Sequence, residues 1–381
     1  MSLGLRRVLL GGGRCWAGRN HTVKYAHLTW EARSESAALA LRTGSALVSV
    51  HPESSFVETE DGWQLAVHRW RPHGSRACEP GAVVMLHGLA TNRINLHPDE
   101  EHSVALSLAR DGFDVFAIEL RGAGLSRSTD SSVPRDWGFG DYAGKDLPAA
   151  LTYIRQCIDG RPLHALGHSM GGMLLLQHEI YNPGSFASMV VVGTPFLKGL
   201  QLQPRERRLL GAIAKVAPET GPASLLPLRK VAGVAGHFSG MSNWFADGMV
   251  INGENTEPAL LALMAQEGIS DLPVRLLREF HERIHAGDAY HGPFKFEEML
   301  DDVKCPSLIL SGTVDNIAPV ESVEKLARAL GSNVLHYREM GVDNGCLANY
   351  GHVDLLVGKR AKLEVYPLIA DFLRESLYTH A

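Results

Sequence analysis

The stretch from Gly167 to Gly172 constrains this chain more than any other. It reads Gly-His-Ser-Met-Gly-Gly, so Ser169 has a glycine two positions away on each side. A short strand-like run precedes it at 161–166, and an apolar, helix-forming run follows at 173–179. Glycine carries unusual backbone dihedrals cheaply and leaves room for a sharp strand-to-helix turn. The pattern predicts a turn that pushes the Ser169 hydroxyl into a cleft, although the motif alone also fits a glycine-rich turn with an incidental serine.

Short apolar runs alternate with helix-like stretches along most of the chain. The runs expected to be buried strands are 82–86, 114–118, 187–192, 306–310 and 333–338. Helical periodicity lies between the first two, at 102–110, and at the end of the chain, at 359–377. This alternation predicts an α/β fold with a mostly parallel, doubly wound sheet covered on both faces. Strand-like runs at 57–60 and 64–70 flank an Asp-Gly turn and predict an antiparallel hairpin at the entrance to the sheet.

Residues 197–300 interrupt this rhythm. They contain glycine-rich apolar pieces and helical runs at 258–266 and 274–284, but no segment that reads as a strand. An insertion of this length between two core strands predicts a helical cap over the cleft, with an unrelated accessory lobe as the alternative. The expected domains are an N-terminal extension at 1–50, an α/β core at 51–196 and 301–381, and the cap at 197–300.

The N-terminal thirty residues are basic. Their charged side chains are Arg6, Arg7, Arg14, Arg19 and Lys24, and the first acidic residue is Glu31. An arginine-rich, acid-free and locally amphipathic segment is typical of organelle transit peptides. We therefore expect an intracellular protein, with mitochondrial or plastid import as one interpretation and a cytoplasmic protein, whose extension carries no address, as the other.

The composition excludes several classes of function. The net charge of −5 gives no overall attraction to phosphate backbones, so no nucleic-acid partner is expected. No run approaches the roughly 20 apolar residues that cross a bilayer, which leaves peripheral contact as the membrane interaction compatible with the sequence. The five cysteines have no metal-ligand spacing and are expected to be mostly free thiols in a reducing compartment. No zinc-protease motif, P-loop or dinucleotide fingerprint occurs, so no metal and no cofactor is expected. The oligomeric state is not indicated.

A serine hydroxyl becomes a useful nucleophile when a base takes its proton and a third group orients that base. Asp315 lies in a loop after the predicted strand 306–310, and His352 follows the last predicted strand beyond a long loop. Taken singly, the aspartate is typical of a turn and the histidine of a satisfied core residue. Together they predict a catalytic triad in the chain order Ser169, Asp315, His352. Weaker candidates for the acid are Asp301, Asp302 and Asp354.

Acyl transfer also requires donors for a developing oxyanion. The sequence Leu86-His87-Gly88-Leu89 follows the first buried strand, and its glycine lets the backbone approach a ligand. We assign the donors to the backbone N–H groups of Leu89 and of Met170, the residue that starts the helix after the turn. His87 is expected to brace this loop.

These motifs together resemble an α/β-hydrolase of the serine lipase/esterase type over residues 55–378. The resemblance rests on His87-Gly88, the glycine turn at 119–126, Ser169, Asp315 and His352. The turn begins with Glu119 where the family commonly has aspartate. The stretch 352–358 also resembles the end of acid lipases, whereas Met170 stands where acid lipases usually have glutamine. Ser169 itself excludes the branches of the fold that carry aspartate or cysteine at this turn.

The expected function is hydrolysis of carboxylic esters through an acyl-enzyme. The apolar cap favours a small-molecule substrate with a hydrophobic acyl group or lipid-like character, although apolar cap residues are equally expected for packing. An acyltransferase would use the same triad, and a ligand-binding protein could share the fold without turnover. A cofactor-free haloperoxidase and a C–C bond hydrolase are smaller alternatives.

Overall fold

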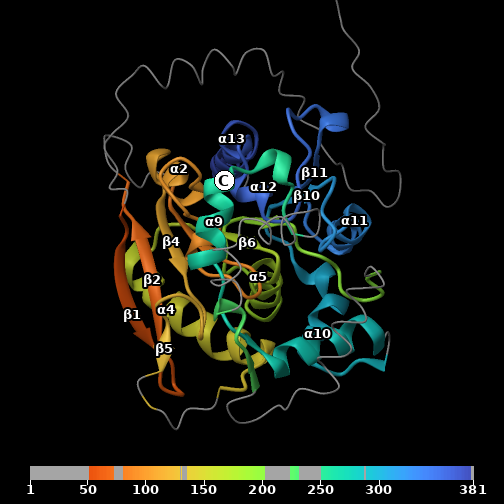
Figure 1. The fold of residues 1–381 in the computed structure, drawn as a ribbon. Coiled ribbons are helices and arrows are strands. Elements are labelled where there is room, and N and C mark those ends of the chain that lie inside the picture. Colours follow the sequence, from red (N-terminus) through yellow and green to blue (C-terminus); the bar gives the residue numbers. More distant parts are fainter. Residues whose placement is uncertain are drawn as a thin grey trace, which may run out of the picture.

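The computed structural model describes seven parts of the chain. They are residues 51–72, 80–128, 130, 135–201, 224–230, 250–286 and 289–378. The predicted extension at 1–50 lies outside the described residues, and so do 202–223 and 231–249 of the predicted cap. Figure 1 shows the described elements arranged around one central sheet.

A mostly parallel sheet forms the centre of the fold. Its strands follow the order β1-β2-β4-β3-β6-β7-β10-β11, and the short strand β5 pairs with β2 beside this path. The pairs of β2 with β1, β4 and β5 are antiparallel, while every pair from β4 to β11 is parallel. The strands are β1 Glu53–Glu58, β2 Trp63–Trp70, β3 Ala82–Leu86, β4 Asp114–Ile118, β5 Arg127–Ser128, β6 Leu163–His168, β7 Met189–Val192, β10 Ser307–Gly312 and β11 Leu335–Met340. The predicted fold class is confirmed.

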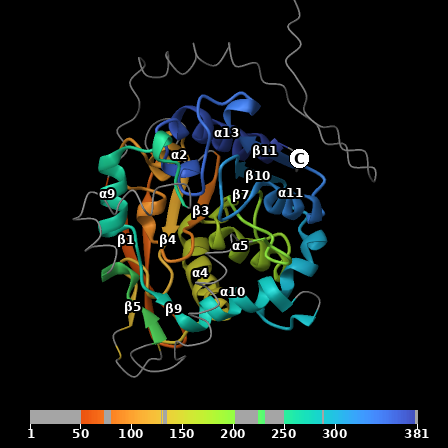
Figure 2. The same ribbon diagram turned by 45° about the vertical axis from the view of Figure 1, so that its right-hand side comes forward.

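Helices cover both faces of this sheet (Figures 1 and 2). The helices between and after the core strands are α2 Val104–Arg110, α3 Phe139–Asp141, α4 Leu147–Ile158, α5 Met170–Tyr181, α11 Val320–Ala329, α12 Asp354–Val357 and α13 Ala361–Glu375. Strand residues alternate between two buried clusters, because successive side chains of a strand point to opposite faces. In β3, Val84 and Leu86 join the cluster that includes α4, α5 and α11, whereas Val83 and Met85 join the one that includes α2 and α13.

The region predicted as a cap contains both helices expected there. They are α9 Pro258–Glu267 and α10 Val274–Ala286. The two helices pack on different clusters, since Leu260 and Met264 of α9 join the α2 and α13 side while Phe280 of α10 joins the α4 and α5 side. The expectation of no strand in this region is wrong. Strands β8 Leu225–Leu226 and β9 Leu272–Pro273 form a separate antiparallel pair, too short for sequence alternation to reveal.

Some predicted boundaries also shift. The predicted strand 161–166 runs instead to His168, and the predicted helix 173–179 starts at Met170. Strand pairing continues to the end of β6 because Ser169 N donates to Val192 O at 2.8 Å. Ser169 is therefore the single residue between the end of β6 and the start of α5. The entrance hairpin is confirmed, but β1 begins and ends earlier than predicted because its polar edge residues carry no clear alternation.

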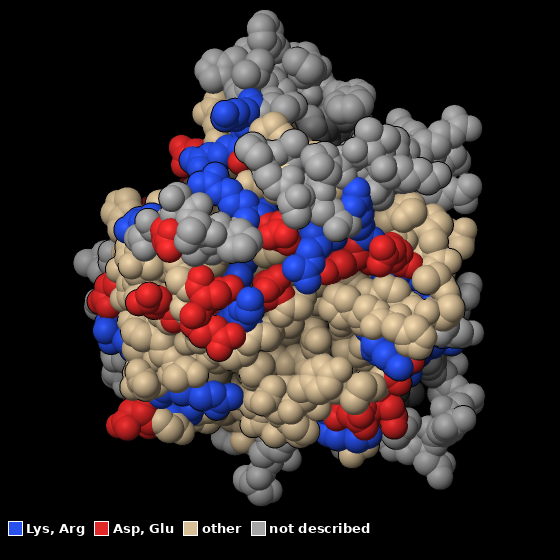
Figure 3. Space-filling model, turned by 90° about the horizontal axis from the view of Figure 1, so that it is seen from below, with Lys and Arg blue, Asp and Glu red and all other residues tan. Residues whose placement is uncertain are grey.

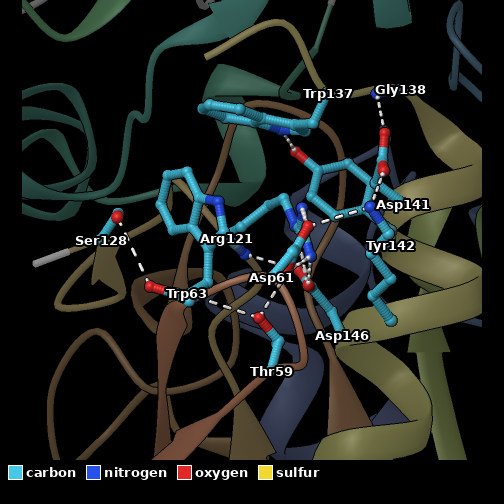
Figure 4. Close-up of polar contacts among 12 residues, drawn as sticks. Thr59, Asp61, Trp63, Arg121, Ser128, Trp137, Gly138, Asp141, Tyr142 and Asp146 are labelled. Carbon is cyan, nitrogen blue, oxygen red and sulfur yellow. Dashed lines mark hydrogen bonds and ion pairs between the residues drawn. The ribbon is translucent and has the colours of Figure 1, made fainter. Parts of the chain in front are cut away.

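The glycine turn after β4 is braced by ion pairs (Figure 4). The Arg121 guanidinium donates to the buried Asp146 carboxylate through Nε at 2.8 Å and to Asp61 through Nη1 at 2.8 Å. Lys145 Nζ adds a bond to Asp61 at 3.0 Å. Burial favours the neutral form of Asp61, but the hydrogen bonds from its neighbours hold the pKa of this carboxyl well below its usual range. Arg121 thus joins the entrance hairpin to the start of α4.

The molecular surface carries charges of both signs. On the face shown in Figure 3, lysine and arginine side chains are interspersed with aspartate and glutamate around a broad area of other residues. No helix in the described part of the chain is long and apolar enough to cross a membrane. A group of three or more histidine, cysteine, aspartate or glutamate side chains suited to a metal ion does not occur among these residues either.

Candidate active site

Ser169 occupies a strained turn between β6 and α5. Its φ is 54° and its ψ is −119°, a conformation that costs a non-glycine residue on the order of 1–3 kcal/mol. Strain of this size persists only where neighbours hold it. The Ser169 N–H donates to Val192 O of β7 at 2.8 Å, and the Ser169 carbonyl accepts from Thr194 Oγ1 at 2.8 Å. The adjacent strand end therefore fixes the backbone of the serine.

The glycines around the serine provide space for this turn. A Cβ on Gly167 would lie 2.4 Å from the N atom of Gly172, and one on Gly171 would lie 2.5 Å from Leu86 O. A Cβ on Gly172 would lie 2.2 Å from Thr194 Oγ1. None of the three has a positive φ, whereas the serine has one. The expectation that these glycines carry the unusual dihedrals is therefore wrong: Ser169 carries them, and the glycines are required because neighbouring atoms leave no room for a Cβ.

Asp315 and His352 form a direct hydrogen bond. Asp315 Oδ2 accepts from His352 Nδ1 at 2.8 Å, and each residue is only 5% exposed. The other carboxylate oxygen, Oδ1, accepts from the backbone N–H groups of Ile317 and Ala318, both at 2.8 Å. The loop after β10 thus orients the carboxylate. Because the carboxylate accepts the Nδ1 proton, the lone pair of the neutral imidazole lies on Nε2.

His168 links the histidine to the serine turn. Its ring packs against the His352 ring with centroids 4.7 Å apart, and its Nε2 donates to His352 O at 3.0 Å. Burial lowers the pKa of His168 well below its usual value, which keeps this ring neutral. Ser169 follows His168 directly. No hydrogen bond between these described residues joins Ser169 Oγ to His352 Nε2, and such bonds between catalytic groups are commonly long before substrate binds.

The loop after β3 approaches the serine turn closely. A Cβ on Gly88 would lie 3.0 Å from His168 Nδ1 and 3.2 Å from Ser169 Cβ. Leu89 is the next residue of this loop, and Met170 is the first residue of α5. Within the described ranges, the backbone N–H groups of Leu89 and Met170 donate no hydrogen bond. Unpaired N–H groups beside a nucleophile are what stabilisation of an oxyanion requires.

Two buried side chains brace this loop. His87 Nδ1 donates to Gly88 O at 2.8 Å, and His87 Nε2 accepts from Leu120 N at 3.3 Å. Burial lowers the pKa of His87, so the ring remains neutral and bridges Gly88 O and Leu120 N. Asn95 Oδ1 accepts from Gly88 N at 3.3 Å. The bracing expected of His87 agrees with these contacts, whereas no sequence signal indicated Asn95.

The weaker acid candidates do not contact the histidine ring. Asp301 pairs with Lys304 at 3.7 Å, and its side chain is 88% exposed. Asp354 is fully buried, but its carboxylate accepts from the backbone N–H of Gly351. His168 was not identified from the sequence, because its position beside Ser169 does not show that its ring contacts His352 in the folded protein.

Comparisons with known proteins concern the family and the fold. The family described as alpha/beta hydrolase fold matches residues 81–346. Lipase member K of Mus musculus is 24% identical over 363 residues, which cover 85% of this chain and 88% of the relative. Gastric triacylglycerol lipase of Rattus norvegicus is 38% identical over 127 residues, covering 30% of this chain and 31% of the relative.

Solved structures show the same fold. A monoacylglycerol lipase from Paleococcus ferrophilus superimposes with a TM-score of 0.54 at 16% identity, covering 81% of this chain and 99% of that chain. A thermophilic esterase from Thermogutta terrifontis gives a TM-score of 0.55 at 17% identity, covering 85% and 99%. At these identities, the likeness concerns the fold.

Proposed function

The chain belongs to the alpha/beta hydrolase fold family and is lipase-like, and from that premise we propose that it is a serine hydrolase of carboxylic esters. The relatives are named as lipases, which supports ester hydrolysis as the reaction class. The observation that carries the serine mechanism is the 2.8 Å bond between His352 and Asp315, next to a serine held in a strained turn.

In this mechanism Ser169 Oγ attacks the ester carbonyl carbon while His352 Nε2 takes the hydroxyl proton. Asp315 holds the imidazole in the required tautomer and stabilises the imidazolium. The backbone N–H groups of Leu89 and Met170 donate to the oxyanion of the tetrahedral intermediate. The intermediate collapses, the C–O bond to the alcohol breaks, and His352 returns the proton to the departing alkoxide.

The acyl-enzyme is then hydrolysed by the same groups. His352 takes a proton from a water molecule, which attacks the acyl carbon, and the second tetrahedral intermediate releases the carboxylic acid and free Ser169. A hydrophobic acyl group or lipid-like substrate fits the lipase names of the relatives. In this proposal residues 197–300 cover the cleft as a cap and select the acyl group.

Hydrolysis of a graded series of p-nitrophenyl esters, from acetyl to palmitoyl, tests the proposal. The purified protein should hydrolyse at least one ester, and Ser169→Ala should lower kcat on the order of 10⁶-fold while the fold is retained. A competing alcohol or thiol in the assay distinguishes hydrolysis from acyl transfer by its product. Equal activity of the wild type and the Ser169→Ala variant would disprove the serine mechanism.

The cellular location is a separate part of the proposal. The basic segment at the start of the chain supports import into an organelle, with a mitochondrion as the first candidate. A fusion of residues 1–50 to a fluorescent protein should co-localise with an organelle marker. Diffuse cytoplasmic fluorescence would favour an extension without an address.

A further inference from the structure

The backbone on both sides of His352 forms hydrogen bonds with Asp354 and with the segment that begins at residue 250. Before it, Gly351 N donates to both oxygens of the Asp354 carboxylate, at 3.0 and 3.1 Å. After it, Val353 N donates to Val250 O at 3.0 Å. A Cβ on Gly351 would lie 2.8 Å from Asp354 Oδ1, so the two groups fit closely. The position of the histidine backbone thus depends on what holds Asp354.

Asp354 is held by the segment that begins at residue 250. Asn252 N donates to Asp354 Oδ1, and Asn255 Nδ2 donates to Asp354 Oδ2, each at 2.9 Å. Asp354 is 0% exposed, and no lysine or arginine of the described part of the chain forms an ion pair with it. A buried carboxylate without a cation is stabilised by the N–H groups that it accepts from. Its donors are Gly351 N, in the loop that carries His352, and two groups of this segment, Asn252 N and Asn255 Nδ2.

The same segment reaches the loop after β3, which carries Leu89, at its far end. We call residues 250–270 the α9 strap, because α9 lies in its middle. Ser270 N donates to Ala90 O at 2.8 Å, and Asn92 Nδ2 donates to Glu267 O at 2.7 Å. The strap therefore contacts the loop that carries His352 at one end and the loop that carries the proposed Leu89 donor at the other.

We propose that Asp354 is a positioning residue that makes the placement of the His352 imidazole depend on docking of the α9 strap. This inference rests on the proposed function, in which His352 is the general base. Asp354 acts through Gly351 N and touches neither the ester nor the serine. When Asn255 and Asn252 N engage the carboxylate, Gly351 is fixed and the imidazole stays between Asp315 and Ser169. When the strap detaches, the Asp354 carboxylate loses its donors Asn252 N and Asn255 Nδ2. Asp354 then no longer fixes Gly351, and the loop that carries His352 is free to shift.

Two substitutions test the proposal from opposite sides. Asp354→Asn places an amide NH₂ among N–H donors, so at least one of the bonds to Gly351 or the strap is lost. Asn255→Ala removes the side-chain donor of the strap and leaves the Asn252 N donor and Asp354 in place. We expect kcat to fall about 10- to 100-fold in Asp354→Asn and less in Asn255→Ala, with KM nearly unchanged, because a displacement of about 1 Å has this effect on catalysis. The double variant should resemble Asp354→Asn alone, since both remove one shared interaction.

Thr256→Val is the matched control. Thr256 Oγ1 donates to Asn252 O at 3.0 Å, so this nearly isosteric change weakens the strap internally without altering a bond of Asp354. Its kcat should equal that of the wild type, even if its melting temperature falls. A loss of kcat in Thr256→Val as large as that in Asp354→Asn would show that general loosening of the strap, and not Asp354, affects catalysis.

A spectroscopic readout decides the question independently of turnover. The proton shared by His352 Nδ1 and Asp315 should give a low-field resonance in the proton NMR spectrum of the wild type, and Asp354→Asn and Asn255→Ala should shift or broaden it. An unchanged resonance with wild-type kcat and a lowered melting temperature would overturn the proposal and leave Asp354 with a purely structural role. If the wild type hydrolysed no ester, the proposed function would fail, whereas the resonance would still report whether Asp354 positions His352.

Discussion

The loop that carries Ser169 and the loop that carries His352 are held by opposite means. Around Ser169 the constraint comes mainly from backbone, because the flanking glycines have no room for a Cβ and Ser169 N donates to Val192 O, with Thr194 Oγ1 adding one side-chain hydrogen bond. Around His352, side chains such as Asp354 and Tyr350 provide most of the anchors, together with the backbone bond from Val353 N to Val250 O. Tyr350 Oη donates to Glu364 of α13 at 2.6 Å, and the Asp354 carboxylate accepts from both the loop and the α9 strap.

This difference predicts how each loop responds to change. A loop fixed by backbone packing resists substitutions at a distance but accepts no added atom within it. A loop fixed by side chains responds to substitutions far along the chain, since each anchor is a separate interaction. The position of Ser169, the proposed nucleophile, is therefore expected to be insensitive to the strap, whereas the position of His352 is expected to depend on it.

The largest expected effect comes from the group that orients the histidine ring. In Asp315→Asn an amide NH₂ replaces the acceptor of the His352 Nδ1 proton and favours the wrong tautomer. We expect kcat to fall on the order of 10⁴-fold with little change in melting temperature. Steady-state kinetics and thermal unfolding measure the two quantities. A fall of less than tenfold would mean that this hydrogen bond does not orient a catalytic base.

A methyl group in the serine turn should show how little space the backbone leaves. In Gly171→Ala the new Cβ would lie 2.5 Å from the carbonyl oxygen of Leu86, which is backbone and cannot move aside cheaply. We expect the free energy of unfolding to fall by about 1–3 kcal/mol, measured by urea denaturation. A variant as stable as the wild type would contradict the view that packing of the backbone fixes this loop.

Gly144 provides the matched control for that substitution. It is exposed, and a Cβ there would meet nothing within 4 Å. Gly144→Ala should leave stability unchanged or raise it by about 0.4–1 kcal/mol, because alanine restricts the unfolded chain. Loss of stability in this variant would indicate that alanine substitution, not the contact with Leu86, explains the result at Gly171.

His164, in the strand that leads into the serine turn, should make the free energy of unfolding depend on pH. His164 of β6 is fully buried between Ser188 Oγ at 2.8 Å and Pro80 O at 3.1 Å, and burial lowers its pKa to about 4. The folded state therefore favours the neutral ring. Its contribution to stability is complete above the unfolded pKa near 6.5 and is lost as the pH falls toward 4. Between pH 7 and pH 5 this residue alone should account for about 2 kcal/mol.

His164→Gln tests this contribution, because glutamine keeps polar atoms for both partners but does not titrate. Urea denaturation at pH 7 and pH 5 should show a smaller loss of stability in His164→Gln than in the wild type. Equal losses would place the acid sensitivity elsewhere, with His97 and His178, whose pKa values burial also lowers to about 4, as the next residues to test.

The serine turn and the positions of the buried strands along the chain could be predicted because their signals are local. Glycines at fixed spacing identify Ser169, and short apolar runs such as 82–86 identify the buried strands. The hydrogen bond between Asp315 and His352, 37 residues apart, was predictable only because both follow strands whose carboxyl ends meet at one edge of the sheet.

The anchors of the histidine loop could not be predicted, because their partners are distant in sequence. Asp354 lies two residues after His352 and reads as a weak acid candidate, but its strap partners Asn252 and Asn255 precede it by about a hundred residues. Strands β8 and β9 escaped for a different reason. Two residues of strand contain no period, so pairing between 225–226 and 272–273 depends entirely on tertiary contact.

The central claim is that Ser169 is a nucleophile activated by its position. Incubation of the full-length protein with a fluorophosphonate, followed by proteolysis and mass spectrometry, tests it most directly. We expect a single phosphonyl adduct on the peptide that contains Ser169, and no adduct in Ser169→Ala or after denaturation of the wild type. An adduct on another residue, or no adduct on a folded protein that hydrolyses esters, would show that Ser169 is not the activated nucleophile.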